Sequence, residues 1–558
     1  MRSNGFSGQN PISLPTSNSR AVQQHLFSLL NNNKTPMGMR DLAQIHAQIV
    51  LNGYTQKNFV LSKLLFLLIS SGNLHHAHQA FQHIHSPSTP TCNHIIRAFS
   101  LSPTPHQSLL TYTTRMQPSP NAHPDTHTFS FLLASCSAMG PSLAACREGE
   151  QIHARVVSSG FYSNVFVQTN LINMYYCSGR DGEAATKARR VFDEMPQRSV
   201  VTWNSLLAGL LRLNHVDAAR KVFDDMPERN VVSWTTMVAE FARSGKCKQA
   251  LVLFREMRRA NVEPDQVALV AALSACAELG DVELGRWIHA YSNSNSLLFQ
   301  QGQQRRLVSL DNALIHMYAK CGLIEEGYRI FREMPRRSTV SWTTMITGFA
   351  MHGQGEDALA IFKQMVNTRG VEPDDVTFIG VLCACSHAGL VDEGRRYFEM
   401  MIRECRIEPR IEHYGCMVDL LSRAGLLDEA YELVTTMPME PNNAVLGALL
   451  GGCRIHKDVE LASRVGGWLY PDDHLVLLAN VYAAAKRWDG VMRAWERMAK
   501  MGVRKPAGRS YIQVNGVIHD FVAGDETHQE AADIYEIVRE VMTQADSLGE
   551  YMSDDSIE

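Results

Sequence analysis

The chain has 558 residues, with a hydrophobic content of 45%, a charged content of 20% and a formal net charge of −4. No apolar run approaches the roughly 20 residues that a membrane-spanning helix requires, so we expect no membrane partner. The slight negative charge argues against a protein that binds polyanions through a broadly basic surface. The 12 cysteines include no C-x-x-C pair. This pattern predicts neither a metal site nor a disulfide framework, and we expect no cofactor.

The start of the chain is poor in acidic residues. No Asp or Glu precedes Asp41, whereas basic residues and serines are present. Acid-poor, serine-rich leaders are typical of organelle transit peptides; a disordered start without a targeting role is the alternative. We expect residues 1–20 to form such a leader and the destination to be a mitochondrion or a chloroplast, with the mitochondrion favoured.

One phrase recurs along the chain. Residues 191–207 read VFDEMPQRSVVTWNSLL, residues 222–238 read VFDDMPERNVVSWTTMV, and residues 330–346 read IFREMPRRSTVSWTTMI. An ordinary globular domain gives no reason for such repetition. Self-similarity at this spacing indicates an array of one small structural unit.

Each copy contains two apolar patterns of helical spacing. Four apolar side chains within residues 203–210 fall on one helix face, and residues 219–226 repeat the spacing. Pro227 then prevents the second helix from continuing. Glycines occupy the matching turn between the helices in other copies: Gly245, Gly322, Gly353, Gly389 and Gly425. A single helical pair cannot bury both of its apolar faces, so we expect the copies to stack into an all-α solenoid with a groove.

The units differ in length, as residues 200–230 and 231–265 illustrate. Further cues are NALIHMYAKCG at 312–322, REGEQIHARVVSSGF at 147–161 and EHYGCMVDLLSRAGLLDEA at 412–430. This text resembles the plant pentatricopeptide repeat (PPR) family, in its PLS subclass of mixed motif lengths. The resemblance implies a right-handed superhelical α-solenoid of stacked helix-turn-helix units, with about twelve units in residues 21–441. The tetratricopeptide repeat is the rival interpretation, but its fixed period and its W-x2-L-G-x2-Y helix are missing.

Three insertions interrupt the repeat, at residues 140–149, 179–188 and 292–306. Solenoids tolerate extra residues at their rims, so we expect these insertions to enlarge turns.

The repeat pattern of the sequence changes after Pro441. Residues 442–509 resemble the E motifs, and residues 510–545 the E-plus extension, of organelle RNA-editing factors in this family. An acidic tail follows at residues 546–558. The alternating segment IQVNGVIHDFV turns at Asn515-Gly516, which predicts a small β-hairpin near the C-terminus. Residues 463–470 are shorter than the family's usual helix, so we expect a shortened first E motif.

The sequence also bears on catalysis. Zinc-dependent cytidine deaminases need an H-x-E triplet followed by P-C-x-x-C. The chain contains His528-Gln529-Glu530, but no C-x-x-C follows and the last cysteine is Cys453. We therefore expect no deaminase domain and no enzymatic activity, with the triplet a polar helix start.

In the resembled family each unit reads one RNA base with its fifth and last residues. The candidate base-reading pairs carried over to this chain are Asn93 with Asp125, Asn204 with Asn230, Thr235 with Asp265, Asn312 with Ser338, and Thr343 with Asp374. Second-position residues that would sandwich a base are Val201, Val232 and Val340. Each polar pair alone is also compatible with a helix cap, because Asn, Asp and Ser cap helices often. Five pairs in register favour base reading.

Hydrogen-bonding chemistry gives the pairs a code. An ionised Asp only accepts hydrogen bonds, so it requires an N–H on the base, which guanine and uracil supply and cytosine does not. Asn donates and accepts, which suits cytosine. The family rule then assigns Thr at the fifth position to purines and Asn to pyrimidines. Reading in parallel with the chain, we expect U-N-N-Y-G-N-Y-G from 5′ to 3′, where Y is C or U.

The leading interpretation is a site-recognition factor for organellar C-to-U RNA editing. The solenoid would select single-stranded RNA, and the E region would recruit a deaminase-bearing PPR protein and organellar editing-factor proteins in trans. An organellar splicing, stability or translation factor is one alternative, and a protein-binding helical scaffold is another.

Overall fold

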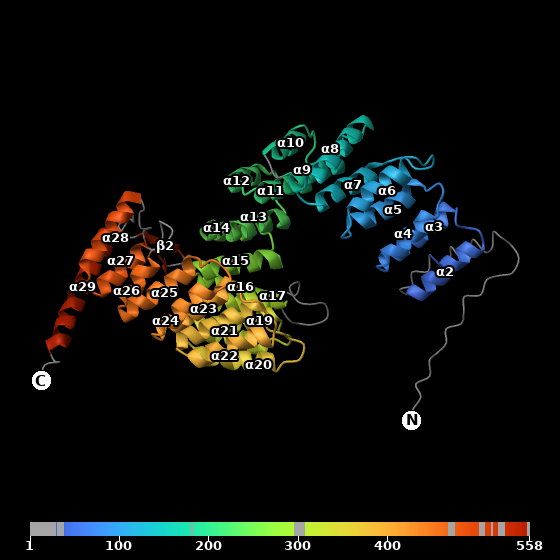
Figure 1. Ribbon diagram of the computed structural model, residues 1–558. Coiled ribbons are helices and arrows are strands. Elements are labelled where there is room, and N and C mark those ends of the chain that lie inside the picture. Colours follow the sequence, from blue (N-terminus) through green and yellow to red (C-terminus); the bar gives the residue numbers. More distant parts are fainter. Residues whose placement is uncertain are drawn as a thin grey trace, which may run out of the picture. The chain divides into compact units, whose positions relative to one another are not determined.

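The computed structural model describes residues 30, 38–179, 182–294, 307–466, 475–501, 508–514, 517–522 and 531–554. These residues are predominantly helical, and their strands form one two-stranded sheet (Figure 1). The predicted all-α class is confirmed. The chain divides into two compact units, Met1–Thr236 and Met237–Glu558, and each is described by itself.

The first compact unit holds five successive helix pairs after α2. Its elements are α2 (Met39–Leu51), α3 (Asn58–Ser70), α4 (Leu74–Gln82), α5 (Thr89–Ser100), α6 (His106–Thr111), the π-helical turn η1 (Tyr112–Met116), α7 (Thr126–Ala138), α8 (Leu143–Ser158), α9 (Val165–Ser178), α10 (Gly182–Asp193), α11 (Val200–Arg212) and α12 (Val216–Asp225). Helix α13 (Val231–Arg243) contains the division between the two compact units.

The second compact unit continues the alternation. Its elements are α14 (Cys247–Arg259), α15 (Gln266–Leu279), α16 (Val282–Ser294), α17 (Val308–Lys320), α18 (Ile324–Glu333), α19 (Thr339–Met351), α20 (Gly355–Val366), α21 (Asp375–Ala388), α22 (Val391–Arg403), α23 (Ile411–Arg423), α24 (Leu427–Thr436), α25 (Asn443–His456), α26 (Val459–Val465), α27 (Leu475–Ala484), α28 (Trp488–Met501), β1 (Arg509–Val514), β2 (Val517–Val522) and α29 (Ala531–Asp554).

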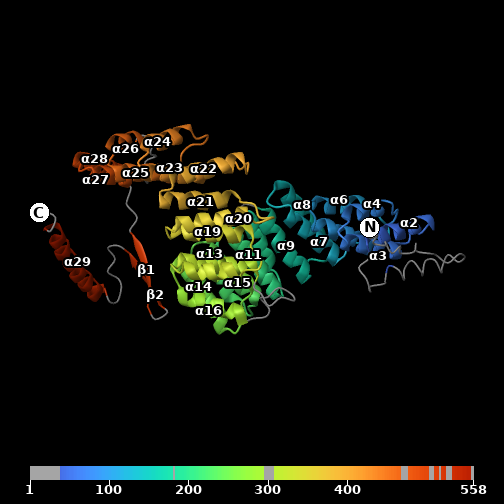
Figure 2. The same ribbon diagram turned by 90° about the horizontal axis from the view of Figure 1, so that it is seen from below.

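Within each compact unit the pairs form two layers. The first helix of a pair packs against the first helix of the next, as α19, α21 and α23 do (Figure 2). Each second helix packs against its own partner and the following first helix, as α20 does against α19 and α21. Fully buried side chains such as Phe362 and Phe378 fill the space between the layers. This stacking of helix-turn-helix units is the one that the repeated phrase predicts.

The repeated phrase builds the joint between one unit and the next. Arg229 follows the end of α12 and donates from Nε and Nη2 to the carbonyl oxygens of Phe223 and Asp224, both at 2.8 Å. Its guanidinium also lies 4.9 Å from the centre of the Phe223 ring, and Trp234 meets that ring edge to face at 4.9 Å. The arginine thus adds hydrogen bonds to carbonyls in the last turn of the helix, where the regular helical bonds end, and the two rings pack beside this contact.

The same joint occurs twice more. Arg198 donates to the carbonyl of Phe192 at 3.0 Å, and Trp203 lies 4.8 Å from the Phe192 ring. Arg337 repeats these contacts with Phe331 and Trp342. The three near-identical phrases therefore encode three copies of one Phe–Arg–Trp joint.

The turn between the helices of a pair requires backbone that only glycine adopts freely. Gly322 and Gly425 have φ of 83° and 81°, in the left-handed region. The other glycines singled out in the sequence also have positive φ, and Asn214 takes the place with φ of 60° in the copy that lacks a glycine. The sequence-based assignment of these turns is confirmed.

The insertions behave differently from expectation. Residues 143–149 form the first turns of α8, and residues 182–188 lie in α10. These two insertions therefore extend or build second helices, and the expectation that they enlarge turns was wrong. The cause is local: Ser142 caps α8, its side chain accepting from the N–H of Ala145 at 3.1 Å. Most of the third insertion lies outside the described residues.

The C-terminal part contains the predicted hairpin. Strands β1 and β2 pair antiparallel, with Val514 opposite Val517 and Arg509 opposite Val522. Before the hairpin, helices α25 to α28 form two further pairs that share one buried core with α23 and α24. Helix α26 is short. Residues 467–474 lie outside the described part of the chain, as do the leader and His528-Gln529-Glu530.

The described residues contain no cluster of three or more His, Cys, Asp or Glu side chains placed to bind a metal ion. Within the same residues, no helix combines the length and apolarity needed to cross a membrane. The repeated cysteines pack in the helical layers, and burial raises the pKa of the Cys136 and Cys385 thiols to about 12.

Candidate nucleic-acid interface

The last residue of a unit caps the first helix of the next unit. Oδ1 of Asp125 accepts from the backbone N–H of Thr128 at 2.8 Å, at the start of α7. Asp265 and Asp374 cap α15 and α21 in the same way, and Ser338 caps α19. These side chains therefore cap helices, which was the alternative considered for each pair alone. In each aspartate this cap uses one carboxylate oxygen. It leaves the second carboxylate oxygen of Asp125 and Asp374 with no hydrogen bond from the described residues.

The first candidate pair is in direct contact. Nδ2 of Asn93, on α5, donates to Oδ1 of Asp125 at 3.1 Å. The hydroxyl of Thr128 lies 2.8 Å from Oδ1 of Asn93 and 2.9 Å from Oδ1 of Asp125. Asn93 and Asp125 are both half-buried, whereas Thr128 is inaccessible to solvent.

The pair of Asn204 and Asn230 repeats this geometry. Nδ2 of Asn204 donates to Oδ1 of Asn230 at 3.2 Å. The hydroxyl of Ser233 donates to Oδ1 of Asn204 at 2.7 Å. Two units separated in sequence therefore place the fifth and last residues together by the same three-residue contact.

The pair of Thr343 and Asp374 is joined through a third side chain. The hydroxyl of Thr377 donates to Oδ1 of Asp374 at 2.7 Å and lies 2.7 Å from the hydroxyl of Thr343. An ionised carboxylate only accepts, so the single proton of Thr377 goes to Asp374 and Thr343 donates to Thr377. Thr343 is 8% exposed, so a ligand can reach only the edge of its side chain.

The two remaining pairs differ. Asn312 is half-buried and its Oδ1 is buried without a partner among the described residues, and Ser338 bonds to Ser341 instead. The structure does not bring Asn312 and Ser338 into a hydrogen bond. Thr235 and Asp265 belong to different compact units, so their pairing stays a prediction from the sequence.

An exposed apolar residue precedes the fifth residue by three positions in most units. The sequence analysis named three of them, and Val201, Val232 and Val340 are 62%, 54% and 57% exposed. Four more occupy the same position, and sequence reasoning missed them: Phe59, Phe166, Val267 and Val376. Apolar side chains this exposed leave most of their surface open to solvent, which makes the second position a surface for a flat ligand.

Electrostatics keep Asp125 ready to accept a hydrogen bond. Burial alone would raise the pKa of this carboxyl, but hydrogen bonds from the backbone and hydroxyl of Thr128 and from the amide of Asn93 outweigh it. The net effect lowers the pKa of Asp125 below its ordinary value. The carboxylate is therefore ionised at neutral pH.

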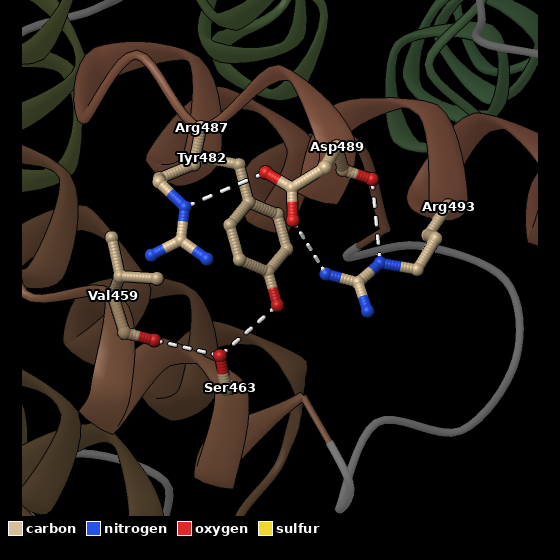
Figure 3. Close-up of polar contacts among 6 residues, drawn as sticks. All are labelled: Val459, Ser463, Tyr482, Arg487, Asp489 and Arg493. Atoms are coloured by element: carbon tan, nitrogen blue, oxygen red, sulfur yellow. Dashed lines mark hydrogen bonds and ion pairs between the residues drawn. The ribbon is translucent and has the colours of Figure 1, made fainter.

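A second surface lies on α28. Trp488, Met492 and Trp495 are exposed and spaced at i, i+4 and i+7, on one face of the helix. Helix α28 packs against α27 and buries Ala494 and Met498. Polar contacts nearby (Figure 3) join Asp489 to Arg493 within α28 at 3.0 Å, and Tyr482 on α27 to the hydroxyl of Ser463 on α26 at 3.0 Å. An apolar face of this size on a fixed helix is typical of a protein-binding surface.

Comparisons with known proteins agree with the repeat. A model described as the PPR repeat family matches residues 198–231, 229–278 and 337–387, and a PPR repeat model matches residues 312–338, 376–405 and 412–440. A crystal structure of PPR10 in complex with an 18-nt psaJ RNA element is similar with a TM-score of 0.40 and 14% identity, over 88% of this chain and 83% of that chain.

Relatives in Arabidopsis thaliana cover nearly the whole chain. One pentatricopeptide repeat-containing protein is 41% identical over 91% of this chain and 94% of its own length. Another is 39% identical over 96% of this chain and 83% of its own length. A third, named as chloroplastic/mitochondrial, is 35% identical over 98% of this chain and 81% of its own length. With this identity along almost its full length, and with the stacked helical pairs described above, the chain belongs to the pentatricopeptide repeat family.

Proposed function

We propose that this chain is a sequence-specific single-stranded RNA-binding protein that selects sites for organellar C-to-U RNA editing. The observation that carries the proposal is the contact between the fifth and last residues of a unit, seen at Asn93–Asp125 and again at Asn204–Asn230. Polar groups that converge at a place open to solvent, beside an exposed apolar side chain, match the two needs of base recognition. The apolar side chain stacks on the base, and the polar pair reads its edge.

The chemistry of each pair supports the order U-N-N-Y-G-N-Y-G. The free oxygen of Asp374 would accept from the N–H groups of guanine, and that of Asp125 would accept from the ring N–H of uracil. In the absence of RNA these side chains bond to each other, so binding exchanges some of these contacts for contacts to the base. The net charge of −4 leaves a smaller share of the affinity to phosphate attraction than in basic RNA binders.

The editing role extends the proposal to the C-terminal part. Residues 21–441 would form the PLS array, residues 442–509 the E motifs, residues 510–545 the E-plus extension and residues 546–558 the tail. The exposed Trp488–Met492–Trp495 face supports a protein partner. We infer that this partner is a deaminase-bearing PPR protein, joined by other editing factors, and that the chain itself is not an enzyme. The names of the relatives support an organelle as the destination.

A binding assay tests the RNA half. The full chain is titrated against an RNA carrying U-N-N-Y-G-N-Y-G and against a copy with both G positions changed to A. We expect the first RNA to bind more tightly. Equal affinities would refute the proposed readout.

Transcript sequencing in a plant that lacks the protein tests the editing half. Loss of a C-to-U change at one site supports it. A changed intron or transcript end, with all edited sites intact, would point to a splicing, stability or translation factor instead. Absence of RNA in crosslinked pulldowns would favour a protein scaffold.

A further inference from the structure

A buried hydroxyl follows most of the helix caps. It belongs to the third residue of the first helix in a unit, and solvent reaches none of these side chains: Thr91, Thr128, Thr202, Ser233, Ser341 and Thr377. Burying a hydroxyl costs free energy unless its hydrogen bonds are satisfied. A helix-capping role accounts for one bond, since the hydroxyl accepts from the backbone N–H of the cap residue, as Thr128 does from Asp125 at 3.1 Å.

The second bond goes to the preceding unit. The hydroxyls of Thr128 and Ser233 each carry one proton and lie between two acceptors: Oδ1 of Asn93 or Asn204 in the preceding unit, at 2.8 and 2.7 Å, and Oδ1 of the cap residue, at 2.9 and 3.0 Å. A donor at this place fixes which end of the amide is the oxygen. Nδ2 is then directed to the cap residue with one proton and keeps the other proton available for a ligand. A capping role alone requires none of these contacts.

The same hydroxyl acts on a threonine reader. Thr377 connects the Thr343 hydroxyl to the carboxylate of Asp374. Thr202 likewise lies 2.8 Å from the hydroxyl of Thr169 and 2.9 Å from that of Ser199. In both units, among the residues that the structure describes, the fifth and last residues share no direct hydrogen bond, and the third-position hydroxyl links them.

We propose that this third-position hydroxyl is a positioning residue for base selectivity: it orients the fifth residue of the preceding unit and holds it in register with the cap. The inference rests on the proposed RNA readout and adds a third member to each reading pair. Removal of the hydroxyl from such a unit keeps the two reading residues but loses the link between them, so the base is selected less sharply.

The chain contains its own comparison. Thr343 with Asp374 and Thr235 with Asp265 are the same residue pair and carry the same predicted base, G. The first is followed by Thr377, whereas the second is followed by Ala268, whose side chain offers no hydrogen bond although its backbone N–H binds Asp265 at 2.9 Å.

The test uses the full chain and RNAs that differ only in one G, changed to A. Thr377→Val keeps the shape of the side chain and removes the hydroxyl. We expect it to lower the G-over-A affinity ratio at the 3′ position about fivefold, the effect of one neutral hydrogen bond. The ratio at the internal G should not change. Thr377→Ser restores the hydroxyl and should restore the ratio.

Two further variants separate positioning from helix capping. Ser341→Ala removes a capping hydroxyl that bonds to Ser338 but not to Asn312, so it should lower thermal stability without changing any base preference. Ala268→Ser adds the missing hydroxyl and should raise the G-over-A ratio at the internal position.

Retention of the wild-type ratio by Thr377→Val would overturn the inference and leave the proposed function standing. A wild-type chain without any preference for G at the 3′ position would overturn both. A uniform loss of affinity for every RNA, with the ratios unchanged, would reduce the hydroxyl to a helix cap and would also overturn the inference.

Discussion

Exchange of Asp374 for Asn should change base preference without changing stability. Oδ1 of Asp374 is already bound by the N–H and hydroxyl of Thr377, at 2.8 and 2.7 Å. Asn keeps an oxygen for these two bonds, and Asn and Asp cap helices about equally well, so the free energy of unfolding should change by no more than about 0.5 kcal/mol. The other oxygen of Asp374 becomes an NH2 group. That group faces the base as a donor where guanine also presents donors.

The magnitude follows from the count of free acceptors. One carboxylate oxygen remains for guanine, and a hydrogen bond to a charged group contributes about 1.5–3 kcal/mol. The G-over-A ratio at the 3′ position should therefore fall about 10- to 100-fold. Fluorescence anisotropy with two RNAs that differ at this base measures the ratio, and thermal denaturation checks the fold. The preference for U at the 5′ position, read by Asn93 and Asp125, is the internal control. A variant that still prefers G to the wild-type extent would show that Asp374 does not contact the base.

Three further changes test the fold. Gly452→Ala should destabilise the chain by about 1–3 kcal/mol, because the added Cβ would lie 2.5 Å from the Cβ and 3.0 Å from backbone atoms of Ser422. The control is Gly451→Ala, whose added Cβ would meet no atom within 4 Å, so the melting temperature should stay unchanged or rise. Arg229→Lys replaces a guanidinium group that binds two carbonyl oxygens by a single ammonium group. We expect the free energy of unfolding to fall by about 1 kcal/mol, measured by thermal or urea denaturation. An unchanged midpoint would show that the arginine does not stabilise the joint. Burial lowers the pKa of His46 and of His153 in the folded chain. The unfolded chain therefore takes up protons first as the pH falls, and stability should decrease between about pH 7 and pH 5; His46→Gln should flatten this slope, and an equal slope in the variant would contradict the assignment.

The repeat could be predicted from the sequence because its signals are periodic. Helix pairs, the turn glycines and the β-hairpin all follow from spacing and from residues with few conformations, such as Gly322 and Pro227. The reading pairs came from the family resemblance rather than from the residues. Their contact with a third hydroxyl was missed, although a signal existed: a Thr or Ser stands three residues after the cap in SVVTW, NVVSW and STVSW.

Other features carried no such signal. Asp281 is fully buried and bonds to Arg255 at 2.7 Å across two elements, and nothing in the local sequence marks either residue. The start of α8 within the first insertion depends on the helix cap at Ser142. The sequence contains many other serines in loops, and nothing distinguishes Ser142 from them as a cap. These contacts depend on tertiary packing, which a pattern within one short segment does not determine.

The Phe–Arg–Trp joint makes the array extensible by block duplication. The segment from Val200 to Asn230 begins just after one joint's arginine and ends just after the next, Arg229. A second copy inserted in frame after Asn230 would present Trp203 of the copy to Phe223 and Arg229, where Trp234 now lies, and Thr202 of the copy to Asn204, where Ser233 now lies. The lengthened protein would gain one helical pair with a Phe–Arg–Trp joint at each of its two ends. Under the proposed readout, its footprint on RNA would grow by one pyrimidine, which gives a direct route to new binding registers by gene engineering.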